Sequence, residues 1–217
     1  MVIGSEKIEF LKRCRVAVFG VGGVGGYVCE ALARCGIGKI DVFDNDTVSP
    51  SNLNRQIIAL HSTIGKKKVD VIKERLLDIN HDIEVEAHDV FYCAENAASF
   101  PLEKYDHIAD AIDSVPSKLE LIRQAKEKNV RIISSMGTGN KLDPSKLEIC
   151  DISKTEYCPL AKAVRVNLRK VGINHLDVVF SREEPVKTGE RTPGSTAFVP
   201  PAAGLLMASK IIKDLTS

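Results

Sequence analysis

The chain has 217 residues, of which 44% are hydrophobic and 27% charged, and its 30 basic and 29 acidic side chains leave a formal charge of +1. This composition excludes a disordered or fibrous protein, and no apolar run is long enough for a membrane span or a signal peptide. The balanced charge neither indicates nor excludes binding to nucleic acid. We expect one cytoplasmic α/β domain over residues 1–217, because the chain is too short for two independent domains.

The first part of the chain alternates between strand and helix patterns. A short polar helix is predicted at 5–13, followed by strands at 15–20, 39–44, 82–90, 105–113 and 130–137 and by helices at 25–36, 66–80 and 115–129. Strands and helices that alternate in this way favour a Rossmann-like, doubly wound, mostly parallel sheet. We therefore predict a nucleotide-binding core over residues 1–137.

The pattern changes after residue 137. Strands are predicted at 146–154 and 176–181, helices at 159–172 and 198–215, and a polar loop rich in Pro, Gly and Thr at 182–196. These segments predict a C-terminal extension over 138–217, with mixed strand directions, packed onto the same sheet.

A glycine-rich turn follows the first strand of the core. Gly20, Gly22 and Gly25 fit the pattern G-x-G-x-x-G, and Gly23 adds to its freedom. Without Cβ atoms, such a turn lets backbone N–H groups and the start of a helix approach phosphate closely. Asp44 ends the next strand, nineteen residues after Gly25, where its carboxylate can accept hydrogen bonds from a ribose. The turn predicts a nucleotide ligand and leaves NAD and ATP both open.

Three charged residues are predicted at the same edge of the sheet, where the strands end. Arg55 and Lys68 can balance charge on a triphosphate as a phosphoryl or nucleotidyl group transfers, and Asp113 can hold Mg²⁺. Taken singly, Arg55 could be a surface ion-pair partner, Lys68 part of a solvated helix start, and Asp113 a helix cap. Their joint position favours a catalytic site, because hydride transfer would need none of them.

The six cysteines contain no C-x-x-C pair, which disfavours structural zinc. Cys29 and Cys35 fall in the first predicted core helix, where we expect both to be buried as small hydrophobic residues. Cys158 falls in a predicted loop, and we expect it to be the most accessible thiol.

Four motifs give a specific family resemblance: "GVGGVG", "DNDTVSPSNLNRQ", "GKKKV" and "DAIDS", in that order. They resemble the adenylating ThiF superfamily, which includes ubiquitin-activating enzymes and the activators of bacterial sulfur-carrier proteins. The resemblance implies ATP and Mg²⁺ as cofactors and formation of an acyl adenylate with release of pyrophosphate. It implies the following roles: the loop glycines Gly20, Gly22, Gly23 and Gly25 bind the nucleotide, Asp44 and Asn52 contact ribose and phosphate, Arg55 and Lys68 hold the triphosphate, and Asp113 binds magnesium.

Later segments are similar to one branch of that superfamily. "IDSVPSKLELI", "VVFSREEP" and "GSTAFVPPAAGLLMASKII" resemble the tRNA threonylcarbamoyladenosine dehydratases, and the similarity covers nearly the whole chain. The resemblance implies ATP-dependent cyclisation of the threonylcarbamoyl group on tRNA through an adenylated carboxylate. It also implies a homodimer and raises a sulfur-trafficking protein as a partner.

A basic stripe on the helix predicted at 159–172 suits a tRNA substrate. Lys162, Arg165 and Arg169 recur at i, i+3 and i+7, and residues 158–191 hold seven basic against four acidic side chains. A solvated helix face would give the same pattern.

The start of the chain departs from the family pattern. Members of the family usually carry an N-terminal arginine that reaches the neighbouring subunit's ATP site, and Lys7, Lys12 and Arg13 do not match its motif. We expect the loss of such a contact to cost on the order of a hundredfold in rate.

Three alternatives stay open at this point. An adenylyltransferase that activates the C-terminus of a ubiquitin-like sulfur carrier would share all four motifs. An NAD-dependent oxidoreductase would use the glycines and Asp44 and leave Arg55, Lys68 and Asp113 without a role. A binding module with a degenerate site would need none of the three.

Overall fold

A seven-stranded sheet forms the centre of the molecule, seen here in a computed structural model that describes residues 2–190 and 192–217. The strand order is β3-β2-β1-β4-β5-β7-β6, and all neighbours are parallel except β6, which runs antiparallel to β7. The strands are β1 (Arg15–Phe19), β2 (Lys39–Phe43), β3 (Glu84–His88), β4 (His107–Asp110), β5 (Ile132–Ser135), β6 (Leu147–Asp151) and β7 (Asp177–Ser181).

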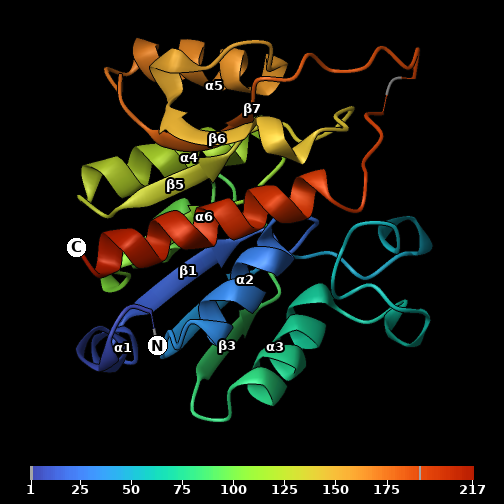
Figure 1. The fold of residues 1–217 in the computed structure, drawn as a ribbon. Coiled ribbons are helices and arrows are strands. Elements are labelled where there is room, and N and C mark those ends of the chain that lie inside the picture. The colour runs from blue at the N-terminus through green and yellow to red at the C-terminus, as the bar shows by residue number, and fades with distance from the viewer. Residues whose placement is uncertain (1, 191) are drawn as a thin grey trace.

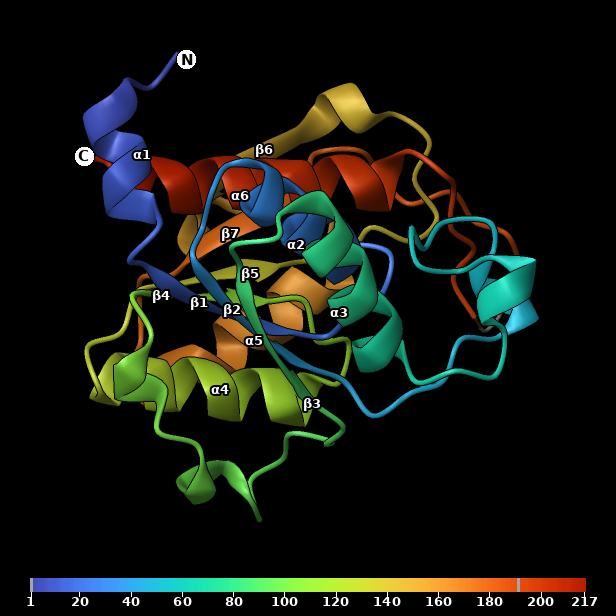
Figure 2. The same cartoon turned by 90° about the horizontal axis from the view of Figure 1, so that it is seen from below.

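Helices cover both faces of this sheet (Figure 1). They are α1 (Ser5–Leu11), α2 (Gly25–Arg34), α3 (Lys68–Ile79), α4 (Val115–Glu127), α5 (Pro159–Lys170) and α6 (Val199–Leu215). Helices α2, α3 and α6 contribute to one buried apolar cluster, and α4 and α5 contribute to another on the opposite face, as the second view shows (Figure 2). The predicted fold class, a doubly wound and mostly parallel sheet with a mixed C-terminal extension, is confirmed.

The central strand β1 shows why the sequence forms this layered arrangement. Its residues Val16 and Val18 point into the cluster beneath α2 and α6, whereas Ala17 and Phe19 point into the cluster beneath α4. All four are fully buried. A strand that is covered on both faces reads as one continuous apolar run, which is how "RVAVF" appears in the sequence.

Several elements are shorter than predicted, since the chain leaves regular structure near the functional edge. The strand predicted at 105–113 ends at Asp110, and residues 111–113 turn into a loop beside the glycine-rich turn. Six short 3₁₀ helices in the connections were not predicted: η1 (Pro50–Asn52), η2 (His61–Thr63), η3 (Ala97–Ser99), η4 (Leu102–Lys104), η5 (Pro144–Lys146) and η6 (Ile152–Lys154).

The last helix, α6, packs directly against α2 (Figure 1). The contact is so close at Gly204 that a Cβ atom there would lie 2.4 Å from the carbonyl oxygen of Val24. The approach brings Pro200, in the first turn of α6, beside Gly23 of the glycine-rich turn. The C-terminal extension therefore reaches the same edge of the sheet as the core motifs. The division of the chain at residue 137 stays a prediction.

Two of the expectations for cysteine are wrong. Cys29 is buried as predicted, but Cys35 is exposed because it follows the last residue of α2 at the helix C-cap. Cys158 is buried, not accessible, because it is the N-cap of α5 and its Sγ accepts a hydrogen bond from the Ala161 N–H at 3.4 Å.

No helix in the described parts of the chain combines the length and apolar character needed to cross a membrane.

A buried histidine makes the stability of the fold depend on pH. His107 is 1% exposed, and its two ring nitrogens lie 3.1 Å from Asp214 Oδ2 and 3.2 Å from the Ile108 carbonyl oxygen. Burial lowers the pKa of His107 despite the nearby Asp214 carboxylate. The unfolded chain therefore takes up a proton near pH 6.5, whereas the folded chain does so only at lower pH.

We predict that the free energy of unfolding falls as pH decreases below about 6.5, by about 1.4 kcal/mol for each pH unit over which only the unfolded state is protonated at His107. Urea unfolding at pH 7.5 and 5.5 measures the difference in the free energy of unfolding between the two pH values. His107→Gln should reduce it, and His81→Gln, at an exposed position, should leave it unchanged. An equal pH dependence in His107→Gln and the unmodified protein would contradict the assignment.

Candidate active site

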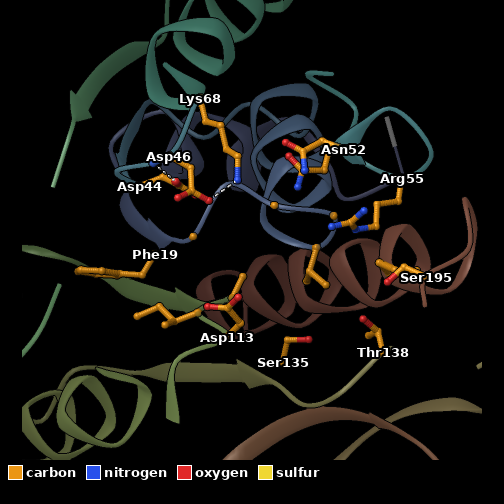
Figure 3. A pocket seen from close by; sticks show the side chains of 18 of the residues that line it. Phe19, Asp44, Asp46, Asn52, Arg55, Lys68, Asp113, Ser135, Thr138 and Ser195 are labelled. Carbon is orange, nitrogen blue, oxygen red and sulfur yellow. Dashed lines mark hydrogen bonds and ion pairs between the residues drawn. The ribbon is translucent and has the colours of Figure 1, made fainter. Parts of the chain in front are cut away.

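A cavity with a volume of about 530 Å³ opens at the carboxyl ends of β1, β2, β4 and β5 (Figure 3). Its walls come from the glycine-rich turn, the segment before α3, the loop after β4, residues 135–139 after β5, and the chain at 193–200. A cavity at this edge of an open parallel sheet is where α/β proteins bind ligands.

Two glycines of the turn are required by close backbone contacts. Gly20 has a φ of +88°, and a Cβ atom there would lie 2.7 Å from the Ala111 carbonyl oxygen. At Gly25 a Cβ atom would lie 1.7 Å from the carbonyl oxygen of Gly20 itself. Gly20, Gly22 and Gly23 line the cavity, whereas Gly25 packs the start of α2 against the turn and is not part of the lining. That these glycines bind a nucleotide stays a prediction.

Asp44 holds the turn in place. Its Oδ2 accepts a hydrogen bond from the Val21 N–H at 2.7 Å, and its Oδ1 accepts one from the Asp46 N–H at 2.8 Å. Each carboxylate oxygen has a second lone pair, so Asp44 can still accept a hydrogen bond from a ribose hydroxyl in the cavity that it lines.

Lys68 is the one lysine of the "KKK" run that lines the cavity. It is 5% exposed, and its Nζ lies 2.7 Å from Asp46 Oδ2 while its backbone N–H donates to the Asp46 carbonyl oxygen at 3.0 Å. Lys66 is exposed, and Lys67 pairs with Asp89 at 3.1 Å. The alternative that the whole run is a solvated helix start does not apply to Lys68.

Asp46 is a site residue that the sequence predictions missed. It follows Asp44 by two positions in "DNDTVSPSNLNRQ", and this placement was the only available signal. The carboxylate of Asp46 is 62% exposed at the cavity and holds the Lys68 ammonium group in position.

Asn52 and Arg55 lie next to Lys68 on the same wall (Figure 3). Arg55 Nη1 donates to the Ser51 carbonyl oxygen at 2.8 Å and to Asn54 Oδ1 at 2.9 Å. Within the described residues no carboxylate pairs with Arg55, so its charge is available to an anionic ligand. Asn52 is buried, and its Oδ1 accepts the Ser49 N–H at 3.0 Å. No group on a described residue accepts a hydrogen bond from its amide NH₂, which can therefore donate to a ligand.

Asp113 faces this group from the other side of the cavity (Figure 3). It is exposed, caps no helix, and makes no hydrogen bond to any described residue. The loop that carries it is fixed by Asp110, whose Oδ1 accepts the Ile112 N–H at 3.1 Å and whose Oδ2 pairs with Lys118 Nζ at 2.8 Å. Lys118 and Asp110 are both fully buried.

The predicted basic stripe on α5 is only partly available. Lys162 and Arg169 are exposed, but Arg165 Nη1 donates to the carbonyl oxygens of Thr155 at 2.9 Å and Ile152 at 3.3 Å. Arg165 thus anchors the turn before α5. Arg191, which contributes to the local positive charge, lies outside the described residues.

Comparison with known proteins identifies the family. The ThiF family model matches residues 1–217. The chain belongs to the ThiF family. The resemblance seen in the four motifs is thereby confirmed, and the match extends over the nucleotide-binding core and the C-terminal extension alike.

Three relatives of this ThiF-family chain are informative. The tRNA threonylcarbamoyladenosine dehydratase of Bacillus subtilis is 42% identical over an alignment 233 residues long, gaps included. The alignment covers 99% of this chain and 92% of the relative. The crystal structure of the Escherichia coli tRNA N6-threonylcarbamoyladenosine dehydratase TcdA in complex with ATP is 33% identical, with a TM-score of 0.93 over 99% of this chain and 90% of that one. The sulfur carrier protein adenylyltransferase of Thermus thermophilus is 38% identical, but over only 54% of this chain and 42% of its own length.

We predict that Arg55→Ala and Lys68→Ala each abolish ATP turnover, because each removes a positive charge from the cavity. The fold should stay intact, because the groups that lose a contact, the Ser51 carbonyl and the Asp46 carboxylate, are exposed to solvent. Release of pyrophosphate and circular dichroism measure the two properties. Lys66→Ala, two residues before Lys68 and outside the cavity, is the matched control and should retain activity. Near-normal turnover in both site variants would show that the site is wrongly assigned.

Proposed function

We propose that this chain is an ATP-dependent tRNA threonylcarbamoyladenosine dehydratase that activates the substrate's carboxylate as an adenylate. The observation that carries the proposal is similarity to the Bacillus dehydratase over 99% of the chain, joined to a cavity that contains Asp44, Asn52, Arg55, Lys68 and Asp113. The Escherichia relative was crystallised with ATP, which supports ATP over NAD as the ligand of the glycine-rich turn.

On this proposal the phosphates of ATP lie against the glycine-rich turn, where backbone N–H groups and the start of α2 favour negative charge. Arg55 and Lys68 stabilise the charge that develops as pyrophosphate leaves. Lys68 exchanges its Asp46 partner for phosphate oxygens, and the Asp46 carboxylate can turn to solvent because it is already largely exposed.

Asp113 fits the role of a magnesium ligand. Its carboxylate is exposed in the cavity and makes no hydrogen bond to a described residue, so its oxygens are available to a hard cation. Bound there, Mg²⁺ would neutralise part of the triphosphate charge.

The reaction balances without an enzyme-bound acyl group. A carboxylate oxygen of the threonyl group attacks the α-phosphorus of ATP, and pyrophosphate leaves with the electrons of the broken P–O bond. A nitrogen or oxygen of the carbamoyl group then attacks the activated carbonyl carbon and closes the ring. AMP leaves and one proton is released, so that the substrate loses the elements of one water at the expense of ATP.

Three further parts of the proposal rest on the family resemblance of the motifs. We expect a homodimer with the cavity near the subunit interface, a sulfur-trafficking protein as a partner, and action in the cytoplasm, where tRNA is modified. The exposed Lys162 and Arg169 on α5 supply positive charge for tRNA phosphates.

The alternatives have weaker support. The match to the sulfur carrier protein adenylyltransferase covers 54% of this chain, whereas the match to the Bacillus dehydratase covers 99%. An oxidoreductase would leave Arg55, Lys68 and Asp113 without function.

The test of the proposal is incubation of the protein with Mg-ATP and tRNA that carries threonylcarbamoyladenosine, followed by gentle digestion and mass spectrometry of the nucleosides. We expect a nucleoside lighter by one water, formed only with ATP and not by Lys68→Ala. An unchanged nucleoside, together with adenylation of a ubiquitin-like sulfur carrier, would instead establish the alternative.

A further inference from the structure

The cavity has two chemically different walls. Both of its basic residues, Arg55 and Lys68, lie on the wall formed before and at the start of α3. The opposite wall, which we call the hydroxyl wall, carries the hydroxyl groups of Ser135, Thr138 and Ser195 beside the Asp113 carboxylate (Figure 3). Among the described residues it carries no basic side chain. A ligand that carries both anionic and neutral polar groups would therefore be oriented by the cavity, with its anionic part toward Arg55 and Lys68.

The hydroxyl wall is held by hydrogen bonds between two segments far apart in the sequence. The Asn140 N–H donates to the Gly194 carbonyl oxygen at 2.8 Å, and the Gly194 N–H donates to Asn140 Oδ1 at 2.7 Å. Gly139 and Pro193 are so close that a Cβ atom on Gly139 would lie 2.7 Å from the Pro193 Cβ. Thr138 and Ser195, which flank these contacts, are thereby fixed relative to each other.

A further hydrogen bond fixes the distance between the two walls. Asn54 Nδ2 donates to the Ser195 carbonyl oxygen at 2.9 Å, and Asn54 also accepts from its neighbour Arg55 at 2.9 Å. Ser195 is thus connected through one side chain to the guanidinium group that faces the anionic part of a ligand. Figure 3 shows Ser195 and Arg55 as neighbours at this end of the cavity.

Two of the three hydroxyl groups have no hydrogen-bond partner in the described part of the chain. Ser135 Oγ donates to the Met136 carbonyl oxygen at 3.2 Å, whereas the hydroxyls of Thr138 and Ser195 make no hydrogen bond to any described residue. Each of these two can both donate and accept. They are therefore the hydroxyl groups on this wall that are available for hydrogen bonds to a ligand.

We propose that Thr138 and Ser195 form the subsite for the hydroxyethyl side chain of the threonyl group, so that the cavity selects a hydroxylated aminoacyl-carbamoyl substrate. The inference rests on the proposed function. The carboxylate to be activated must meet the α-phosphate beside Arg55 and Lys68, which leaves the side-chain hydroxyl of the substrate for the hydroxyl groups of Thr138 and Ser195. A site built to hydrogen-bond a substrate hydroxyl discriminates against the analogue that lacks it.

The test compares two tRNA substrates, one with threonylcarbamoyladenosine and one with the glycyl analogue, in which hydrogen replaces the hydroxyethyl side chain. The ratio of kcat/KM for the two substrates is measured by the loss of water from the nucleoside. We expect the protein to prefer the threonyl substrate, and Thr138→Val and Ser195→Ala each to lower the ratio by about tenfold. Ser209→Ala, an exposed hydroxyl on α6, is the control and should keep the original ratio.

Calorimetric titration with a non-hydrolysable ATP analogue, done on the same variants, separates the two walls. Nucleotide affinity that is retained while the ratio falls supports the subsite and shows that the variants are folded. A nucleotide affinity that falls together with the kcat/KM ratio would show that the hydroxyls bind the nucleotide. A kcat/KM ratio that is unchanged in both variants would show that the hydroxyls do not select the substrate. Either result overturns the inference. If the unmodified protein dehydrates neither tRNA, the proposed function itself fails, and this inference fails with it.

Discussion

The carboxylate of Asp44 is the constraint on which the cavity depends. By accepting N–H groups from Val21 and Asp46 at 2.7 and 2.8 Å, it joins the glycine-rich turn after β1 to the segment after β2. Asp46 in turn holds Lys68 through both its carboxylate and its carbonyl oxygen. One acidic side chain thereby sets the distance between the turn that would receive phosphate and the cation that would neutralise it, before any ligand binds.

The rest of the fold supplies the other side of the cavity. The buried ion pair of Lys118 and Asp110 fixes the loop that presents Asp113, because it joins the ends of β4 and β5 to α4. The extension after residue 137 then adds a wall of its own, and the close contact of α6 with α2 at Gly204 brings that wall to the glycine-rich turn.

Much of the site was predictable because parallel strands end at one edge of a sheet. A motif at the end of each strand must meet the others there, which is why Asp44, Lys68 and Asp113 were expected together and line one cavity. What the sequence did not reveal depends on long-range hydrogen bonds and side-chain direction. Asn54 and Ser195 are 141 residues apart, and no local pattern records their contact. Cys158 likewise was misjudged because a residue in a loop pattern became a buried helix cap.

The central claim is that the substrate's carboxylate attacks the α-phosphate of ATP at a site made by Arg55 and Lys68. Its most direct test uses tRNA in which the carboxylate oxygens of threonylcarbamoyladenosine are labelled with ¹⁸O. If the carboxylate is adenylated, ring closure expels AMP that carries one labelled oxygen, and the pyrophosphate carries none. Label in inorganic phosphate, with ADP as the other product, would show attack at the γ-phosphate and would contradict the account.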